Sequence, residues 1–375
     1  MLNRKMNLIT SKNNKNLQID NSNYEMVIDF AEKIADNKSF DPEVLSYAEF
    51  KEDNFDHICL VNFADIHFFD QGMQKKRFDI ASKFLSGTSN AVAVLSGDTF
   101  TVSTLSGASN AHVNKINNTN SAILGRKCLK SVKNKILFGV GGNHDGEHGA
   151  RNRDSNISLT RLVLDSLDID YFQYNALLKI ELDNKPFYVL VTHGSGKASS
   201  KEGAIDVIRK KCEYLNSRFN IYPNLVLTGH FHADVNGRYM MEVPVYKNGI
   251  LVSTKTQELI VESAPALQGD SEFTAAHNMD TTIPNVNAFD ISFKRNPYYN
   301  AKNSLTESPI IWNVIKFPIL RSKTDALSKS AKVYMETYKE PEIRDLIEDA
   351  VQRKNLNLDS LKNGIKEIAG EVKGL

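Results

Sequence analysis

Five short apolar runs in this chain each end at residues that can bind a metal ion, and the last run shows the pattern most fully. Residues 225–228 are apolar up to Thr228 and are followed at once by Gly229, His230, Phe231 and His232. A short apolar run with a proline just before it is typical of a buried strand. Two histidines at a spacing of two point to the same side of an extended backbone, or serve two neighbouring metals where the backbone turns. Taken alone, the pattern also fits a hairpin corner that carries two exposed histidines.

The other four runs have the same signature. They end, in chain order, in Asp65-Ile66-His67, Gly97-Asp98, Gly141-Gly142-Asn143-His144-Asp145 and Thr192-His193-Gly194. A single aspartate or histidine after a strand is usually a turn or capping residue. Five such endings in one chain favour a shared site instead.

Helical periodicity separates most of these runs. We expect strands at 58–64, 91–95, 135–140, 177–182, 187–191, 225–228, 289–293 and 310–317, with mostly β structure over 234–263. We expect helices at 71–85, 123–132, 158–167 and 201–219. Strands that alternate with helices predict an α/β core. In such sheets ligands bind beyond the carboxyl ends of the strands, which is where the metal-binding residues fall.

The chain divides into three expected parts. Residues 1–55 form an N-terminal arm with added helices, and residues 56–320 form the main domain. That domain contains an inserted polar loop near 99–120 and a region, 264–308, whose pattern predicts no structure beyond one strand. Residues 321–375 have a helical pattern with charges of both signs, and we expect a helical tail.

Two helices are expected before the first strand. Apolar residues recur at helical spacing over 24–37, and a second helix is expected at about 42–50 with Asp41 as its N-cap. The terminal helices of the chain are also where a homo-oligomer could form.

Composition excludes some classes of function. The formal net charge is +1, so no overall field attracts nucleic acid or membranes, although a local patch would suffice for either. No apolar run approaches the roughly 18 residues that span a bilayer, and the polar N-terminus lacks the apolar segment of a secretory signal. Three scattered cysteines fit a reducing compartment, so we expect a cytoplasmic protein without membrane partners.

The candidate ligands are carboxylates, imidazoles and one amide oxygen, without a thiolate. This set suits Mn, Fe, Zn or Ni rather than a structural zinc site rich in cysteine. The ligands are too many for one ion, so two ions must share one, and Asp98 is the candidate bridge. Two metals roughly 3.5–4 Å apart can hold a hydroxide of near-neutral pKa between them and neutralise phosphate oxygens, so that the hydroxide attacks phosphorus in line with the leaving oxygen.

The motifs Asp-x-His, Gly-Asp, Gly-Asn-His-Asp, His-Gly and Gly-His-x-His occur here in the order in which the calcineurin-like metallophosphoesterase superfamily has them. The resemblance covers about residues 57–235. It implies a four-layer α-β-β-α sandwich of two facing mixed sheets, which agrees with the order of strands and helices expected above. It extends to nucleases that share Gly-Asn-His-Asp and Gly-His-x-His, without selecting them uniquely.

The resemblance also implies roles for single residues. One metal would be held by Asp65, His67, Asp98 and His232, and the other by Asp98, Asn143, His193 and His230. His144 would lie near the leaving group as a proton donor or transition-state stabiliser, with Asp145 orienting it.

The sequence departs from the superfamily pattern at one point. Many members carry an aspartate or asparagine a few residues after Gly-Asp, where this chain has Thr99-Phe100-Thr101. The groups that support the metal ligands there are therefore undefined.

The remaining histidines and the basic residues near the motifs have weaker signals. We expect surface or packing roles for His57, His112 and His277, and either such a role or substrate contact for His148. Lys197 and Lys201 follow the His193-Gly194 motif and could contact phosphate, or simply begin a solvated helix.

These observations predict a phosphodiesterase that cleaves nucleotide or nucleic-acid diesters with a metal-bridging hydroxide. Manganese is the expected metal, with iron, zinc, nickel or magnesium as alternatives. A phosphomonoesterase acting on proteins or small molecules is the second hypothesis. A non-catalytic scaffold that keeps the fold is the third, and it fits less well because no ligand position has been lost.

Overall fold

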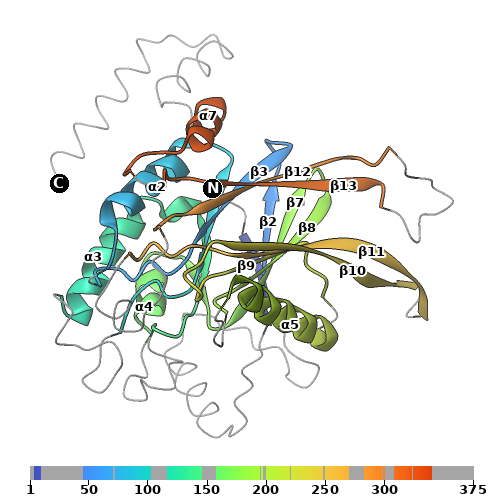
Figure 1. The fold of residues 1–375 in the computed structure, drawn as a ribbon, viewed down its shortest axis with the longest axis horizontal. Coiled ribbons are helices and arrows are strands. Elements are labelled where there is room, and N and C mark those ends of the chain that lie inside the picture. Colours follow the sequence, from blue (N-terminus) through green and yellow to red (C-terminus); the bar gives the residue numbers. More distant parts are fainter. Residues whose placement is uncertain are drawn as a thin grey trace, which may run out of the picture.

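The fold was obtained as a computed structural model of the full chain (Figure 1). The structure describes residues 4–9, 45–70, 72–102, 116–145, 158–194, 196, 200–219, 221–247, 250–269, 283–297, 299, 308–322 and 324–339.

Two mixed sheets make up the centre of the molecule. The seven-stranded sheet has the order β1 (Arg4–Ile9), β2 (Leu45–Glu52), β7 (Asn175–Leu182), β8 (Lys185–Thr192), β9 (Leu225–Thr228), β11 (Ile250–Ser263) and β10 (Val235–Lys247). The six-stranded sheet has the order β13 (Ile310–Pro318), β12 (Asn287–Arg295), β3 (His57–Phe63), β4 (Ala91–Ser96), β5 (Ile136–Val140) and β6 (Asp170–Phe172).

The helices lie on the outer faces of the two sheets (Figure 1). They are α2 (Lys75–Gly87), α3 (Asn118–Lys130), α4 (Leu159–Asp165), α5 (Lys201–Phe219) and α7 (Lys329–Thr337), with a 3₁₀ turn at Lys133–Lys135. Three buried apolar clusters separate the layers. One lies between the sheets, one lies between the six-stranded sheet and α2, α3, α4 and α7, and one lies between the seven-stranded sheet and α5. The expected α-β-β-α sandwich of two facing mixed sheets is therefore confirmed.

Local sequence explains where several elements begin and why some strands are wholly apolar. The side chain of Asn117 accepts from the N–H of Asn120 at the start of α3, and Ser158 and Ser328 cap α4 and α7 in the same way. All six residues of β4 are buried, because the inner strands of both sheets are covered on both faces.

One element differs from the expectation. Residues 42–50 were expected to be a helix, but β2 occupies Leu45–Glu52 and pairs in parallel with β7. Buried Ser46, Ala48 and Phe50 alternate with more exposed neighbours, which is the period of a strand rather than of a helix. The stretch is short enough that pairing with a sheet edge outweighs its helix propensity. The helix expected at 24–37 lies outside the described residues.

The division into three parts stays a prediction. Both β1 and β2 fall within 1–55 and extend the seven-stranded sheet, and α7 places one helix in the expected C-terminal tail. In the part of the chain that the structure describes, no helix combines the length and the apolar character that crossing a membrane requires.

The strand directions decide where the site forms. β3, β4 and β5 run parallel to one another, as do β8 and β9 in the other sheet. Parallel strands bring their carboxyl ends to one edge of a sheet. The two facing sheets thus deliver their strand ends to a common region.

Candidate metal centre

Every residue that the sequence predicted as a metal ligand lies just beyond the carboxyl end of one of five strands. Asp65 and His67 follow β3, Asp98 follows β4, Asn143 follows β5, His193 follows β8, and His230 and His232 follow β9. Two groups have their ligand atoms within 4.8 Å of one another: Asp65, His67 and His232 form the first, and Asp65, Asp98 and His193 form the second. Residues more than 160 positions apart in the chain thus share one site.

The backbone at these ligands is in an unusual conformation. Five of them have a positive φ: Asp65 at 48°, His67 at 47°, Asp98 at 48°, His230 at 70° and His232 at 52°. A non-glycine residue in this left-handed region costs on the order of 1–3 kcal/mol. Such strain persists where the surroundings impose it, and here it occurs at side chains that meet beyond the strand ends of both sheets.

Two glycines let the ligands approach this closely. Gly97 has a φ of +92°, and a Cβ at its position would lie 2.5 Å from Nδ1 of His193. A Cβ at Gly229 would lie 2.5 Å from Oδ2 of Asp65. The Gly-Asp and Gly-His motifs therefore need glycine for space beside the partner ligands, and Gly97 needs it for its backbone conformation as well.

The protonation of His193 is set by a backbone carbonyl. Its Nδ1 lies 3.0 Å from the carbonyl oxygen of Ser96, so Nδ1 carries a proton and donates it. Its Nε2 lies 3.0 Å from Oδ2 of Asp98 and 2.8 Å from Oδ1 of Asn143. Burial disfavours a charged ring, but the Asp98 carboxylate outweighs burial and raises the pKa of His193 to about 10. The position of Nε2 therefore demands a positive charge.

A backbone carbonyl also sets the tautomer of His230, which carries its proton on Nε2. Its Nε2 donates to the carbonyl oxygen of Gly196 over 2.7 Å, and its Nδ1 lies 2.8 Å from Oδ1 of Asn143. A neutral His230 thus directs a lone pair at an oxygen that also faces His193. Two imidazole nitrogens, an amide oxygen and a carboxylate cannot all be satisfied by one another, whereas a divalent cation accepts all four.

The first group of candidate ligands, Asp65, His67 and His232, also has acceptors that a cation would satisfy. Nε2 of His67 is buried and makes no hydrogen bond to any described residue, while Nδ1 of the same ring lies 2.7 Å from Oγ1 of Thr101. Nε2 of His232 lies 3.4 Å from Oδ1 of Asp65, whose carboxylate also accepts from the N–H of His230. Burial lowers the pKa of His67 to about 4, so this ring is neutral and its Nε2 lone pair is open to a metal.

Asp98 lies between the two groups. Its Oδ2 is 3.0 Å from Nε2 of His193 and 4.0 Å from Nε2 of His67. Burial opposes the ionised form, but the surrounding histidines, His193 first, hold the pKa of Asp98 well below its usual range. This placement suits the predicted bridge, and Asp65 is the residue that belongs to both groups of ligand atoms. The chemistry of the donor set therefore fits two divalent cations.

His144 and Asp145 sit at the turn after β5. The N–H of His144 donates to Oδ1 of Asp98 over 2.7 Å, and its carbonyl accepts from Val102 over 2.9 Å. Its ring is half-buried and meets the His67 ring edge-on, with centroids 5.2 Å apart. The backbone of His144 is thus fixed beside the metal ligands while its imidazole keeps access to solvent.

Asp145 acts differently from the expectation. Its buried carboxylate accepts from the N–H groups of Gly142 and Phe100 and from the hydroxyl of Thr160. None of the hydrogen bonds between described residues joins it to the His144 ring. Burial and the nearby Asp98 raise the pKa of Asp145 to about 7. Asp145 therefore holds the backbone of the turn and the loop after Asp98, and it orients His144 only through that backbone.

Sequence reasoning missed the groups that support the ligands. They are the hydroxyl of Thr101, the carboxylate of Asp70, the amide of Gln268 and the carbonyls of Ser96 and Gly196. Thr101 had one available signal, because it stands in the segment where the superfamily resemblance predicts an aspartate or asparagine. The two carbonyls had none, since any residue supplies one.

Most of the weaker candidates cannot be placed relative to the site. His112, His148, Lys197 and His277 lie outside the described residues. Lys201 begins α5 and is exposed.

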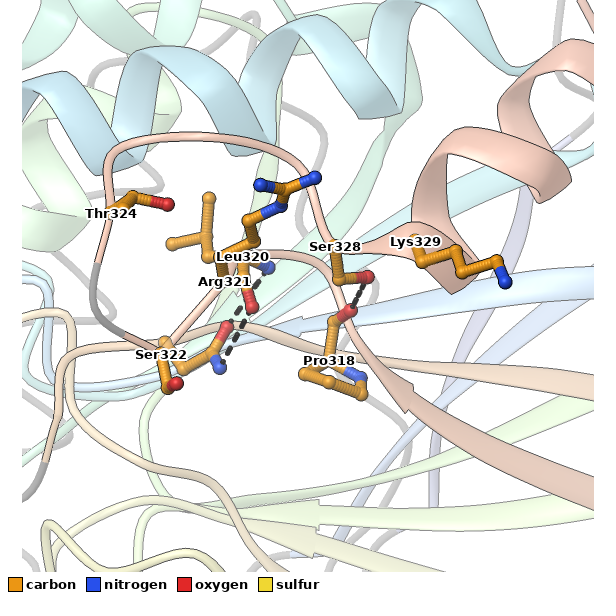
Figure 2. A pocket seen from close by; sticks show the side chains of 8 residues that line it. Pro318, Leu320, Arg321, Ser322, Thr324, Ser328 and Lys329 are labelled. Atoms are coloured by element: carbon orange, nitrogen blue, oxygen red, sulfur yellow. Dashed lines mark hydrogen bonds between the residues drawn. The ribbon is translucent and has the colours of Figure 1, made fainter.

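A separate pocket of about 450 Å³ lies at the end of β13 and the start of α7 (Figure 2). Ser328 lines it and donates to the carbonyl of Pro318 over 2.5 Å, and Arg321 and Lys329 add two cations. Pro318 pairs with Asn287, which in turn pairs with Asn62 on β3, so the pocket lies at the same edge of the sheets as the metal ligands. None of the predicted ligands lines it.

Comparison with known proteins gives a distant structural likeness only. No family model and no curated protein matches the sequence. Solved structures that match include a predicted phosphoesterase from Streptococcus pneumoniae TIGR4 (10% identity, 63% of this chain and 84% of that chain, TM-score 0.29). They also include the calcineurin-like phosphoesterase YfkN from Bacillus subtilis (11%, 75% and 96%, 0.30) and a 5'-nucleotidase from Candida albicans SC5314 (10%, 76% and 56%, 0.34). At these scores the likeness says nothing of what this chain acts on.

Proposed function

We propose that this chain, which resembles the calcineurin-like metallophosphoesterase superfamily in its two-sheet fold and in the order of its motifs, hydrolyses phosphoric esters at a dinuclear metal centre. The observation that carries the proposal is the conflict among acceptors around Asn143. Nε2 of His193 and Nδ1 of His230 face its Oδ1, each at 2.8 Å; the Nδ1 of His230 carries no proton, and His193 is held as a cation beside Asp98. A cation bound there would remove the conflict, and the group that contains His67 needs a second one.

Two divalent cations would supply an activated water and would neutralise the charge on phosphate oxygens. The protein would hold them through the carboxylates of Asp65 and Asp98, the amide oxygen of Asn143 and the four histidines. Four of the seven side chains are buried and the others are half-buried, so most are already in place and little reorganisation is needed when the ligands take up charge. The hydrogen bonds from His193 to Ser96 and from His230 to Gly196 fix which nitrogen of each ring faces the site.

His144 would act on the leaving group. Its backbone is fixed on both sides, by Asp98 and by Val102, while its imidazole remains accessible to solvent and substrate. In that position the protonated imidazole gives its proton to the leaving oxygen as the P–O bond breaks, and the neutral ring regains a proton from solvent. General acid catalysis of this kind contributes about 10²–10⁴-fold to a rate.

The substrate class that we favour is a phosphodiester of nucleotides or nucleic acid. Its support is the sequence resemblance, which extends to nucleases that share Gly-Asn-His-Asp and Gly-His-x-His. The second candidate, a phosphomonoester, uses the same metals and the same ligands, and only relative rates separate the two.

The test measures hydrolysis of bis-p-nitrophenyl phosphate and of p-nitrophenyl phosphate with added Mn²⁺. We expect diester turnover in the native chain and its loss in Asp98→Asn and His230→Ala. His57→Gln, a change at the opposite end of β3, is the matched control and should keep full turnover. Preference for the monoester would move the proposal to a phosphatase. Absence of turnover together with absence of bound metal would overturn it.

The role of His144 has its own test. Replacing His144 with alanine should slow hydrolysis of a phenyl ester more than that of a p-nitrophenyl ester, because p-nitrophenolate leaves without a proton. An equal loss on both esters would show that His144 stabilises charge rather than donating a proton.

A further inference from the structure

Buried polar side chains support His67 from the side opposite the metal ligands. Oγ1 of Thr101 lies 2.7 Å from Nδ1 of His67, and the same hydroxyl lies 3.1 Å from Oδ2 of Asp70. The amide of Gln268 donates to that Asp70 oxygen over 3.2 Å. Thr101 is 4% exposed and His67 is 2% exposed, so bulk solvent cannot replace the bond between them, while Asp70 is half-buried.

The direction of the hydrogen bonds follows from the chemistry of the partners. An ionised carboxylate can only accept, so the Thr101 hydroxyl donates its single proton to Asp70. That hydroxyl oxygen is then left to accept, and its partner Nδ1 of His67 must carry the proton. Consequently Nε2 of His67 has none and presents a lone pair to the first metal group, where it makes no other hydrogen bond.

We propose that Thr101 and Asp70 form a positioning relay that fixes the tautomer and the direction of His67 for metal binding. The inference rests on the proposed metal centre. In many metal sites a carboxylate accepts directly from a ligating histidine, and here a threonine hydroxyl stands between the two. The relay is also tied to the other ligands, because the N–H of Gln268 donates to the carbonyl of Asp65 over 3.1 Å.

The other tautomer of His67, with its proton on Nε2, would leave buried groups without hydrogen-bond partners. With the proton on Nε2, Nδ1 would compete with Asp70 for the one Thr101 proton, and the Nε2 proton would point to a buried position without an acceptor. A buried donor or acceptor left without a partner costs about 1–3 kcal/mol. The relay therefore selects the metal-binding form before any metal arrives.

The chain offers a matched control two residues away. Thr99 is fully buried, follows the same ligand Asp98, and its hydroxyl has no hydrogen-bond partner in the part of the chain that the structure describes. Thr99→Val and Thr101→Val are therefore the same chemical change in the same loop, and only the second breaks the relay. Thr101→Ser keeps the hydroxyl and should therefore keep the Mn²⁺ affinity and the His67 tautomer of the native chain.

The experiment measures Mn²⁺ binding to the full chain by the electron paramagnetic resonance signal of free Mn²⁺, beside the histidine tautomers of the metal-free protein by ¹⁵N NMR. The His67 resonances are assigned by their loss in His67→Gln. We expect Thr101→Val to weaken one Mn²⁺ site by about 10–100-fold and to shift His67 away from the Nδ1–H form. Thr99→Val and Thr101→Ser should resemble the native chain.

Equal Mn²⁺ affinity and an unchanged His67 tautomer in Thr101→Val would overturn the relay, as would an equal loss in Thr99→Val. If Thr101→Val does not fold, Asp70→Ala makes the same test, because it removes the acceptor that orients the hydroxyl. Neither readout needs a substrate. A chain that binds Mn²⁺ through this relay but cleaves no ester would refute the proposed function and leave the relay standing.

Discussion

The two ends of strand β3 each carry histidine and aspartate, yet they differ in how donors meet acceptors. At its start, Nδ1 of His57 lies 3.2 Å from Oδ1 of Asp290. Just past its end, Asp65 and His67 join the metal-ligand groups. The composition of the two groups is similar, so the difference must come from their hydrogen bonding.

At the start of β3 donors face acceptors, although the buried Oδ1 of Asn90 has no hydrogen-bond partner among the described residues. The hydroxyl of Tyr334 donates to Asp290 over 2.8 Å and accepts from the amide of Asn90 over 2.9 Å. The His57 ring packs on the Tyr338 ring, with centroids 4.5 Å apart. Asp290 and Asn90 belong to the sheet side and Tyr334 belongs to α7, so this group attaches α7 to the sheet. His57 thus has the packing role expected from the sequence.

At the end of β3 the acceptors face one another. His193 and His230 each donate one ring N–H to a backbone carbonyl and turn the other ring nitrogen toward Asn143, and that nitrogen of His193 also faces Asp98. Left-handed backbone occurs at five of the ligands, while His57 is not among the residues with positive φ. A cluster of acceptors held by strained backbone indicates a cation site, whereas donors that face acceptors indicate a structural role.

The largest expected effect is the loss of metal and activity in Asp98→Asn. Removing the buried carboxylate between the two groups should lower ester hydrolysis by at least about 10³-fold, or about 4 kcal/mol of transition-state stabilisation. Asp290→Asn, the same change at the other end of β3, should leave hydrolysis unchanged. Metal content and turnover of both variants measure this. Equal losses of metal and of turnover in the two variants would contradict the assignment of a metal site to one end of β3 and a structural group to the other.

A smaller effect is expected from Gly97→Ala. The added Cβ would meet the His193 ring, and alanine would be strained at a φ of +92°. We expect the free energy of unfolding to fall by about 1–3 kcal/mol and metal affinity to fall with it. Gly87→Ala at the end of α2 is the control, because its Cβ would make an ordinary 3.4 Å contact with Met335. Calorimetry measures the free energy of unfolding of both variants, and metal titration measures their metal affinity.

Glu262 is a buried carboxylate outside the ligand groups, and it tests the distinction between a cation site and a structural group. Glu262 is 1% exposed, its Oε1 accepts from Asn287 over 2.9 Å, and Lys316 lies 2.5 Å from it. Burial nonetheless raises the pKa of Glu262 from 4.5 to about 8. Its Oε2 has no hydrogen-bond partner among the described residues, but Asn287 and Lys316 both hold its Oε1, and we assign Glu262 to structure although it lies near the site edge.

The pH dependence that follows has a definite sign. Between pH 4.5 and about 8 the folded chain holds more protons at Glu262 than the unfolded chain. Its stability should therefore fall as the pH rises, by up to about 1.4 kcal/mol per pH unit, and this slope should end above pH 8. Glu262→Gln should flatten the slope in urea unfolding and leave Mn²⁺ binding unchanged. A loss of Mn²⁺ in this variant would make Glu262 part of the metal centre.

The smallest effect is expected from Tyr334→Phe. Removing the hydroxyl leaves Asp290 and Asn90 each without one partner, at a cost of about 1 kcal/mol in the free energy of unfolding. Ester hydrolysis should not change, because the group lies at the far end of the sheet. Chemical denaturation beside the diester assay makes the measurement. A drop in hydrolysis without a drop in stability would connect α7 to the site.

The sequence by itself determined most of the strands and named the candidate ligands that the structure brings together. The apolar runs over 58–64, 91–95, 135–140 and 225–228 are the buried strands β3, β4, β5 and β9, because strands covered on both faces need continuous apolar residues. A ligand at a strand end is visible in sequence, since it follows directly on such a run.

Only the tertiary structure decided which groups face each other. The segment at 42–50 became β2 because a neighbouring strand was available to pair with it. Thr101, Asp70 and Gln268 support His67 from three separate parts of the chain, and carbonyls of Ser96 and Gly196 set two tautomers. These contacts depend on side-chain directions and on backbone atoms common to every residue, so no local pattern of residue types records them.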